Sequence, residues 1–272
     1  LLLLVIVVVT TAFIWGGSLL LERAAENLSL YYGLPPIVHG ALVIAIGSSF
    51  PELSSVVFAA LEGEFNLGVS AVVGSAIFNV LVIPAISGLY GAGVGASRDI
   101  VYKEAQFYMG SVSALIITFA LAVIYNPTGG DGQLLGTVTR QLAIIPVLLY
   151  GVYVFTQYQD TSDYDAESPP EDLVVAKEWL FLLVSLLVIA VAVEELVAAA
   201  IDLGELFDTP AELWGITVIA AATSLPDTLV SVRAARDNRG VTSLANVLGS
   251  NTFDLLVAIP VGVLIVSEWT VD

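Results

Sequence analysis

The stretch VVGSAIFN, at residues 72–79, recurs as VLGSNTFD at residues 247–254. A second stretch, GSSFPE at 47–52, recurs at the same offset as ATSLPD at 222–227. The offset is 175 residues in both cases, and no gap is needed across about 45 residues. The matches fall on small and polar residues inside apolar surroundings, where chance does not concentrate agreement. We therefore interpret the chain as an internal duplication.

The rest of the 272-residue chain is strongly apolar. Hydrophobic residues make up 57% of it and charged residues 12%, which is about half the charged fraction of a typical soluble domain. Residues 1–21 carry no charge and are long enough to cross a hydrocarbon core as one helix. A signal peptide has a shorter apolar region, so a retained helix is predicted here. The composition therefore indicates an integral membrane protein.

Eight apolar runs, separated by turn residues or charges, predict eight membrane spans. If the N-terminus lies outside, seven of the eight Lys and Arg residues fall on the cytoplasmic side. The positive-inside rule therefore favours a multi-pass protein of the cell membrane with its N-terminus outside. The predicted spans are 1–21, 37–61, 66–90, 105–125, 134–157, 174–201, 211–235 and 241–266.

The two copies of the repeat are predicted to be inverted relative to one another, because the second span maps onto the seventh, five crossings later. Inverted repeats that meet near the membrane midplane are a common plan of secondary transporters, with the substrate site at their interface. The acidic stretch at 158–173 then becomes a cytoplasmic linker between a first half at 1–157 and a second half at 174–272. We predict an all-α polytopic membrane protein of this inverted-repeat kind.

The charge balance restricts the partners of the protein. With 26 acidic and 8 basic residues the formal charge is −18, which disfavours nucleic-acid binding. The sequence contains no cysteine, which excludes disulfides and thiolate metal sites. The lipid bilayer and transported cations are therefore the expected partners, with no protein partner and no cofactor predicted.

Each copy of the repeat places oxygen-bearing side chains one helical turn apart. Residues four apart share one face of a helix, so each pair projects its oxygens in the same direction. Four such faces converging on a common axis would form a site lined by oxygen alone. The pairs are Ser48 and Glu52, Ser75 and Asn79, Thr223 and Asp227, and Ser250 and Asp254.

Three carboxylates, Glu52, Asp227 and Asp254, lie deep within apolar spans that hold no Lys or Arg at a comparable depth. An ionisable group at the centre of a membrane helix costs about 2.5–3.5 kcal/mol on insertion scales, so a bound cation is the expected compensation. Pro51 and Pro226 add to this, because each frees a carbonyl four residues earlier that a cation can occupy. Oxygen ligands without His or Cys suit Ca²⁺, Na⁺ or K⁺ rather than Zn²⁺ or Cu²⁺.

The motifs GSSFPE, VVGSAIFN, ATSLPD and VLGSNTFD resemble the two alpha-repeats of the sodium/calcium exchangers, in the Ca²⁺/cation antiporter superfamily. The resemblance is strong over 37–90 and 212–265. It implies exchange of Ca²⁺ against Na⁺ at a central site of four cation positions. It also implies alternating access, in which the first and sixth spans slide across a rigid core. The ion ligands it implies are the carbonyls of Ala45 and Ala220 and the side chains of Ser48, Ser49, Glu52, Ser75, Asn79, Thr223, Ser224, Asp227, Ser250 and Asp254.

Some features leave the transported ions and the completeness of the fold open. The stretches SLPD and GSNTFD resemble the potassium-dependent subgroup, in which an acid at the position of Asp254 is linked to K⁺ use. Three ionised carboxylates leave one negative charge against Ca²⁺, so either Asp254 takes a proton or K⁺ joins Ca²⁺. Members of the family have ten spans, so the eight predicted here suggest a truncated second half.

Two alternatives to Na⁺/Ca²⁺ exchange fit the sequence less well. A Ca²⁺/H⁺ antiporter normally pairs Gly-Asn with a downstream Glu in both repeats, and this chain does not. An intramembrane aspartyl enzyme would use Asp227 and Asp254 as a catalytic pair. The repeat and the absence of a GxGD motif from the sequence disfavour it, so the protein is not expected to be an enzyme.

Overall fold

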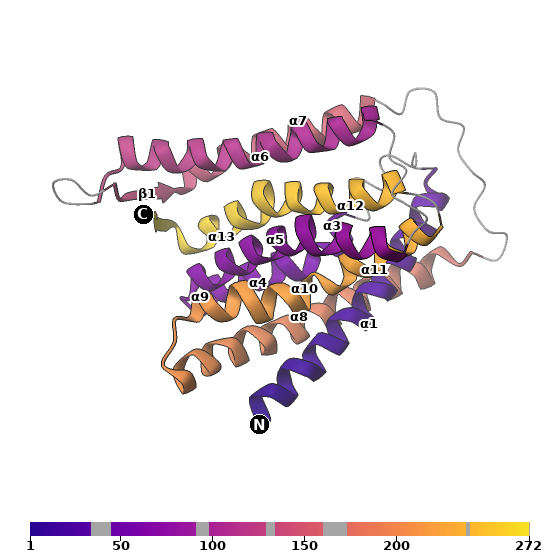
Figure 1. The fold of residues 1–272 in the computed structure, drawn as a ribbon, viewed down its shortest axis with the longest axis horizontal. Helices are drawn as coiled ribbons and strands as arrows, with labels where there is room; N and C mark the ends of the chain where they lie inside the picture. Colours follow the sequence, from indigo (N-terminus) through magenta and orange to yellow (C-terminus); the bar gives the residue numbers. More distant parts are fainter. Residues whose placement is uncertain (34–44, 91–97, 129–133, 160–172, 238–239, 272) are drawn as a thin grey trace.

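The computed structural model describes residues 1–33, 45–90, 98–128, 134–159, 173–237 and 240–271. These residues form a bundle of helices with one short pair of strands (Figure 1). The helices are α1 (Leu2–Tyr31), α3 (Ala45–Ser48), α4 (Phe50–Leu61), α5 (Phe65–Tyr90), α6 (Arg98–Tyr125), α7 (Arg140–Gln159), α8 (Val175–Phe207), α9 (Ala211–Trp214), α10 (Ala220–Thr223), α11 (Leu225–Arg236), α12 (Gly240–Phe253) and α13 (Ile259–Val266). Two π-helical turns, η2 (Gly215–Ile219) and η3 (Asp254–Ala258), join α9 to α10 and α12 to α13.

The membrane spans agree with the apolar runs of the sequence. Among the described residues, six helices are long and apolar enough to cross a bilayer. The pair 211–223 and 225–236, bent by 42°, makes a seventh. The span predicted at 37–61 is described only from Ala45 onward, as α3 and α4, and its first part lies outside the described residues. Most of the 158–173 linker also lies outside them, so its place and the division into two halves stay predictions.

The helix boundaries repeat with the same offset as the sequence. Both α3 and α10, and likewise α4 and α11, begin and end 175 residues apart. A proline stands in the first turn of α4 and of α11, where its missing N–H is tolerated. The same proline obstructs helix continuation from the preceding segment, so both copies break at the preceding serine, Ser49 or Ser224.

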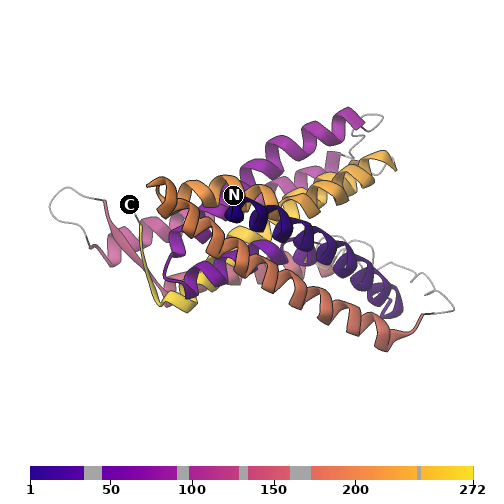
Figure 2. The same ribbon diagram turned by 90° about the horizontal axis from the view of Figure 1, so that it is seen from below.

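The two copies run in opposite directions through the molecule. Helices α1 and α8 lie side by side along most of their length with opposite chain directions (Figures 1 and 2). Helix α5 and the run from α12 to α13 also point in opposite directions (Figure 1). The inversion expected from an odd number of crossings is therefore confirmed by the arrangement of the helices.

Close packing between the copies depends on glycine. A Cβ atom added to Gly74 in α5 would lie 2.7 Å from the Cβ of Ala220 in α10 and would also strike the backbone of Ile216. Small residues of this kind let membrane helices approach until their backbones touch. The Gly-Ser step of the first copy therefore presses directly against the broken helix of the second.

A short ribbon of two strands was not predicted from the sequence. Strand β1 (Gly136–Thr139) pairs antiparallel with β2 (Glu268–Val271) just before α7 begins. Trp269 anchors β2, because its indole N–H donates to Asn66 Oδ1 at 2.8 Å and its ring contacts Phe65 and Phe119 edge to face. Strand β1 lies within the apolar run at 134–157, which predicts a membrane helix. Thr and Val are common in strands but also occur in membrane helices, so the sequence does not distinguish the two there.

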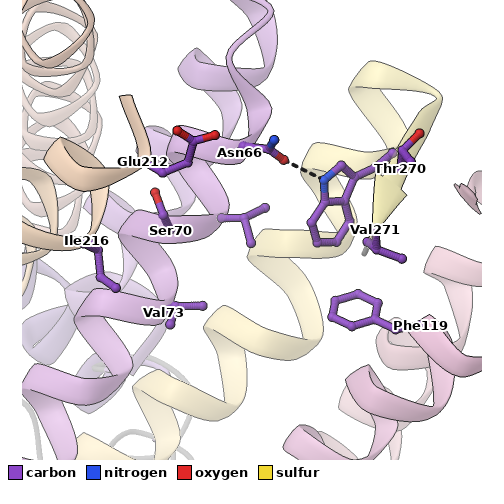
Figure 3. Close-up of a pocket in the computed structure, with 10 residues that line it drawn as sticks. Asn66, Ser70, Val73, Phe119, Glu212, Ile216, Thr270 and Val271 are labelled. Carbon is purple, nitrogen blue, oxygen red and sulfur yellow. Dashed lines mark hydrogen bonds between the residues drawn. The ribbon is translucent and has the colours of Figure 1, made fainter. Parts of the chain in front are cut away.

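A cavity of about 390 Å³ lies beside this ribbon (Figure 3). Asn66, Ser70 and Val73 of α5 line one side of it, and Glu212 and Ile216 line another (Figure 3). None of the side chains predicted as ion ligands reaches this cavity. It is therefore separate from the polar cluster described next.

Candidate cation site

The ten side chains predicted as ion ligands come from the two broken helices and from the helices that follow them. They lie in α3–α4 and α5 of the first copy, and in α10–α11, α12 and η3 of the second. None of the ten is more than 1% exposed. We call Ser48, Ser49, Glu52, Ser75, Asn79, Thr223, Ser224, Asp227, Ser250 and Asp254 the oxygen cluster. Its role in ion binding stays a prediction, but the structure brings its members together in one buried region.

Glu52 accepts a hydrogen bond from its own copy of the repeat and lies near hydroxyl groups of the other copy. The hydroxyl of Ser75 donates to Glu52 Oε1 at 3.2 Å, and Ser75 Oγ lies 2.9 Å from Ser224 Oγ of the second copy. Thr223 also lies within reach of this carboxylate. The other oxygen, Glu52 Oε2, is buried and has no hydrogen-bond partner in the described part of the chain.

Asp227 receives more hydrogen bonds than its counterpart. Ser250 Oγ donates to Asp227 Oδ1 at 3.1 Å, which is the bond equivalent to Ser75 on Glu52. Asn246 Nδ2 donates to the same oxygen at 3.3 Å, and Asn79 Nδ2 donates to Asp227 Oδ2 at 3.1 Å. These three donors stabilise the negative charge of Asp227 without a bound cation, because hydrogen bonds to a carboxylate are charge-assisted.

Asp254 is the least satisfied of the three acids. Both of its oxygens are buried without a hydrogen bond of normal geometry to any described residue, although the Ser49 hydroxyl lies near enough to interact. The charges of Glu52 and Asp227 also reach it. A buried charged group left unpaired costs more than the roughly 1–3 kcal/mol of a neutral one, so Asp254 needs a partner that the described side chains do not supply.

The unpaired atoms at this site share one chemical property. They are Ser49 Oγ, Glu52 Oε2, Asn79 Oδ1, Asn246 Oδ1 and both carboxylate oxygens of Asp254. All are oxygens with free lone pairs, and no buried nitrogen of these side chains is left without an acceptor among the described residues. Lone pairs that converge without donors are what a hard cation binds, since Ca²⁺ takes six to eight oxygen ligands.

The carboxylates are distributed across the site. Within the described ranges, no three acidic side chains lie close enough to hold one metal ion together. A cation bound here would therefore take its remaining ligands from hydroxyl, amide and carbonyl oxygens. The carbonyl of Ala220 already accepts from the Ser224 amide at 3.1 Å and from Thr223 Oγ1 at 3.4 Å, so the hydroxyl must turn away to free it. Ala45 lies in α3, as the sequence predicts.

Two asparagines of the site were not singled out from the sequence. Asn246 bonds Asp227, while Asn251 accepts from Asn79 Nδ2 at 3.0 Å and donates to the carbonyl of Ala76 at 3.4 Å. In the repeat, Asn246 and Asn251 align with the apolar Ala71 and Ala76, so a search for matched positions passes over them. An amide inside an apolar span was the signal that could have found both.

Comparison with known proteins agrees with this architecture. The sequence pattern described as "Sodium/calcium exchanger protein" matches residues 2–159 and 177–272. Inner membrane protein YrbG of Escherichia coli strain K12 is 28% identical over 252 residues, covering 90% of this chain and 74% of YrbG. Human sodium/potassium/calcium exchanger 5 is 45% identical over 53 residues, covering 20% of this chain and 11% of that protein.

A solved structure shares the fold over nearly the whole chain. The sodium-calcium exchanger NCX_Mj superposes with a TM-score of 0.64 at 22% sequence identity, covering 97% of this chain and 83% of NCX_Mj. The family pattern covers both copies of the repeat, including every member of the oxygen cluster. The chain therefore belongs to the sodium/calcium exchanger family and is a multi-pass membrane cation antiporter, not an enzyme.

Proposed function

We propose that this antiporter exchanges Ca²⁺ against Na⁺ by alternating access at the oxygen cluster. The observation that carries the proposal is the set of buried oxygens without donors, centred on Asp254 and Glu52. A hard cation of either charge satisfies such a set, and competition between Na⁺ and Ca²⁺ for the same oxygens couples their movements. The names of NCX_Mj and exchanger 5 support the choice of ions.

The two equivalent acids, Glu52 and Asp227, take Ca²⁺ between them in this proposal. Asp227 is already oriented by three donors, so it provides a fixed ligand. Glu52 offers an oxygen that no described group occupies, so it attracts positive charge more strongly than Asp227 does. Na⁺ ions bind the same oxygens in the alternative state, after α1 and α8 have moved across the core.

Helices α1 and α8 are proposed to move as one unit. They pack against one another along their length (Figure 2). A Cβ atom added to Gly17 in α1 would lie 2.8 Å from Ile189 Cγ1 in α8, so the two backbones are held closely together. A pair packed this tightly slides across its neighbours more readily than it separates, which is the shear type of motion.

A potassium-dependent form of the exchange is a second candidate, favoured by Asp254. Its two unpaired oxygens give a monovalent cation a place beside Ca²⁺. Three carboxylates against one Ca²⁺ leave a single negative charge, and one K⁺ or one proton neutralises it. The short match to human sodium/potassium/calcium exchanger 5 supports K⁺ in this role.

Ca²⁺ uptake into proteoliposomes tests both forms. Purified protein is reconstituted in vesicles loaded with Na⁺, and Ca²⁺ entry is followed after dilution into Na⁺-free buffer, with and without K⁺. We expect uptake that requires the outward Na⁺ gradient, and a K⁺ requirement would select the second form. Uptake that follows a proton gradient and ignores Na⁺ would replace the proposal with Ca²⁺/H⁺ antiport.

A further inference from the structure

One carboxylate outside the oxygen cluster lies close to it. Glu22 is in the C-terminal half of α1, the helix that contacts α3, α10 and α11. Its neighbour Leu21 packs on the first copy of the motif, since a Cβ atom on Gly47 would meet the Leu21 side chain at 3.7 Å. Glu22 is half-buried, and its Oε1 atom is enclosed with no hydrogen-bond partner among the described residues.

Two serines share the face of α1 that carries Glu22. Ser18 and Ser29 lie four residues before and seven residues after it, spacings that return to the same side of a helix. Their side chains are 0% and 3% exposed, and neither hydroxyl has a hydrogen-bond partner in the described part of the chain.

This arrangement is unusual within α1 itself. Thr10 and Thr11, earlier in the helix, donate to carbonyls four residues back at 2.8 and 2.6 Å, which is how hydroxyls in membrane helices normally bond. Ser18 and Ser29 make no such bond. The face from Ser18 to Ser29 therefore presents unpaired oxygens over about 16 Å of helix.

The charged groups near Glu22 indicate which parts of the molecule this side of α1 connects. Glu22 lies within electrostatic range of Asp227, a member of the oxygen cluster, and of Arg233 and Glu26. Asp227 is buried at the start of α11, whereas Arg233 is exposed toward its end. Helix α11 lies beside the C-terminal half of α1 (Figure 1), and α1 continues beyond Glu22 to Tyr31, at the face of the molecule where the helix ends.

We propose that Glu22 and the hydroxyl of Ser18, one helical turn apart, form a cation-binding site on α1. The hydroxyl of Ser29, about 10 Å further along the helix, marks the same route, by which ions pass between the oxygen cluster and the molecular face at which α1 ends. The site would take a partly hydrated Na⁺ or Ca²⁺ ion. One carboxylate and one hydroxyl bind more weakly than the cluster does, and a site on a conduction route must release its ion readily. The inference rests on the proposed function, because it assigns a route to the ions exchanged there.

Transport measured separately at the two membrane faces tests the inference. Glu22→Gln removes the charge and keeps the shape of the side chain. We expect KM for the cation at the face where α1 ends to rise about tenfold, since a local carboxylate concentrates cations there. We expect kcat and KM at the opposite face to stay unchanged, and Glu22→Asp to restore part of the affinity.

Glu26→Gln is the matched control, with the same change in charge one turn further along α1 at an exposed position. If the wild type exchanges Na⁺ for Ca²⁺ and the two variants behave alike at both faces, the inference is wrong. If Glu22→Gln fails to give a monodisperse protein, Ser18→Ala with Ser29→Ala tests the same face, and an unchanged KM would again contradict the inference.

A binding measurement separates this inference from the proposed function. A hydrophobic carbodiimide labels carboxyl groups in apolar surroundings, and mass spectrometry reads the extent of labelling at Glu22 and Glu26. We expect Ca²⁺ or Na⁺ to protect Glu22 and leave Glu26 unprotected. If the wild type shows no Na⁺-driven Ca²⁺ uptake, protection at Glu22 still identifies a cation site there, and its absence rejects one.

Discussion

Glu52 and Asp227 occupy equivalent places in the two copies of the repeat, yet their surroundings differ. Asp227 accepts hydrogen bonds from a serine and two asparagines, whereas Glu52 keeps one oxygen without a partner among the described residues. The backbone is duplicated, but the amide donors gather around one acid. The comparison teaches that a two-fold symmetric backbone can hold an asymmetric site. Asp227 is held in place by hydrogen bonds in one copy, whereas Glu52 in the other copy has an oxygen free to bind a cation.

The largest expected effect comes from the less satisfied acid. Glu52→Gln removes the negative charge whose Oε2 atom has no partner within the described residues. In the proposed function this charge pairs with the bound cation, and removing one member of a buried charge pair costs about 3 kcal/mol. We expect kcat/KM for Ca²⁺ to fall about 100-fold, since each 1.4 kcal/mol is tenfold. Glu62→Gln, an exposed acid just after α4, is the control and should transport normally. Near-normal transport by Glu52→Gln would remove the contrast between the copies.

The contact between the copies is tested next. Gly74→Ala places a Cβ 2.7 Å from that of Ala220 and against the backbone of Ile216, and overpacking of this kind costs about 1–3 kcal/mol. We expect a lower midpoint of thermal unfolding in detergent and reduced transport. Gly88→Ala, in the same helix with open space around its Cβ, should leave the midpoint unchanged or raise it. Equal midpoints for the two variants would show that the copies do not press together at Gly74.

A third prediction concerns the position at which the copies differ most, Asn79 against Asp254. Asp254→Asn removes a carboxylate with both oxygens unpaired, so the place for a second cation is lost. We expect some Ca²⁺ transport to remain. The increase in its rate caused by K⁺, or the change in its rate with pH, should become about tenfold smaller, which corresponds to roughly 1.4 kcal/mol. Asp202→Asn, an exposed acid on α8, serves as the control. Unchanged K⁺ and pH dependence in Asp254→Asn would exclude this role.

The smallest expected effect tests the extra donor on the second copy. Asn246→Ala removes a 3.3 Å hydrogen bond to Asp227, and a net hydrogen bond of this kind is worth about 1 kcal/mol. We expect the apparent affinity for Ca²⁺ to change about fivefold, measured as KM for uptake, with the protein fully folded. Asn66→Ala, which alters an asparagine outside the cluster, is the control. A loss as large as that of Glu52→Gln would mean that Asn246 is itself essential for binding.

The amino-acid sequence by itself determined the membrane class, the duplication and its offset. Long apolar runs and proline act locally, so the helix breaks before Pro51 and Pro226 and the 175-residue offset of the helix boundaries follow from residues close together in the chain. Eight of the ten side chains of the oxygen cluster follow from the helical spacing of oxygen-bearing residues within apolar spans, whereas Ser49 and Ser224 were expected only from the resemblance to the exchanger repeats.

Tertiary structure alone decided how the polar groups are shared. Asn79 meets Asp227 across 148 residues of sequence, and Ser75 meets Ser224 across 149. Neither the repeat nor helical periodicity specifies which donor faces which acid, because that depends on how two inverted copies rotate and press together at Gly74. The same packing decided that Asn246 and Asn251 join the site and that Trp269 anchors a strand.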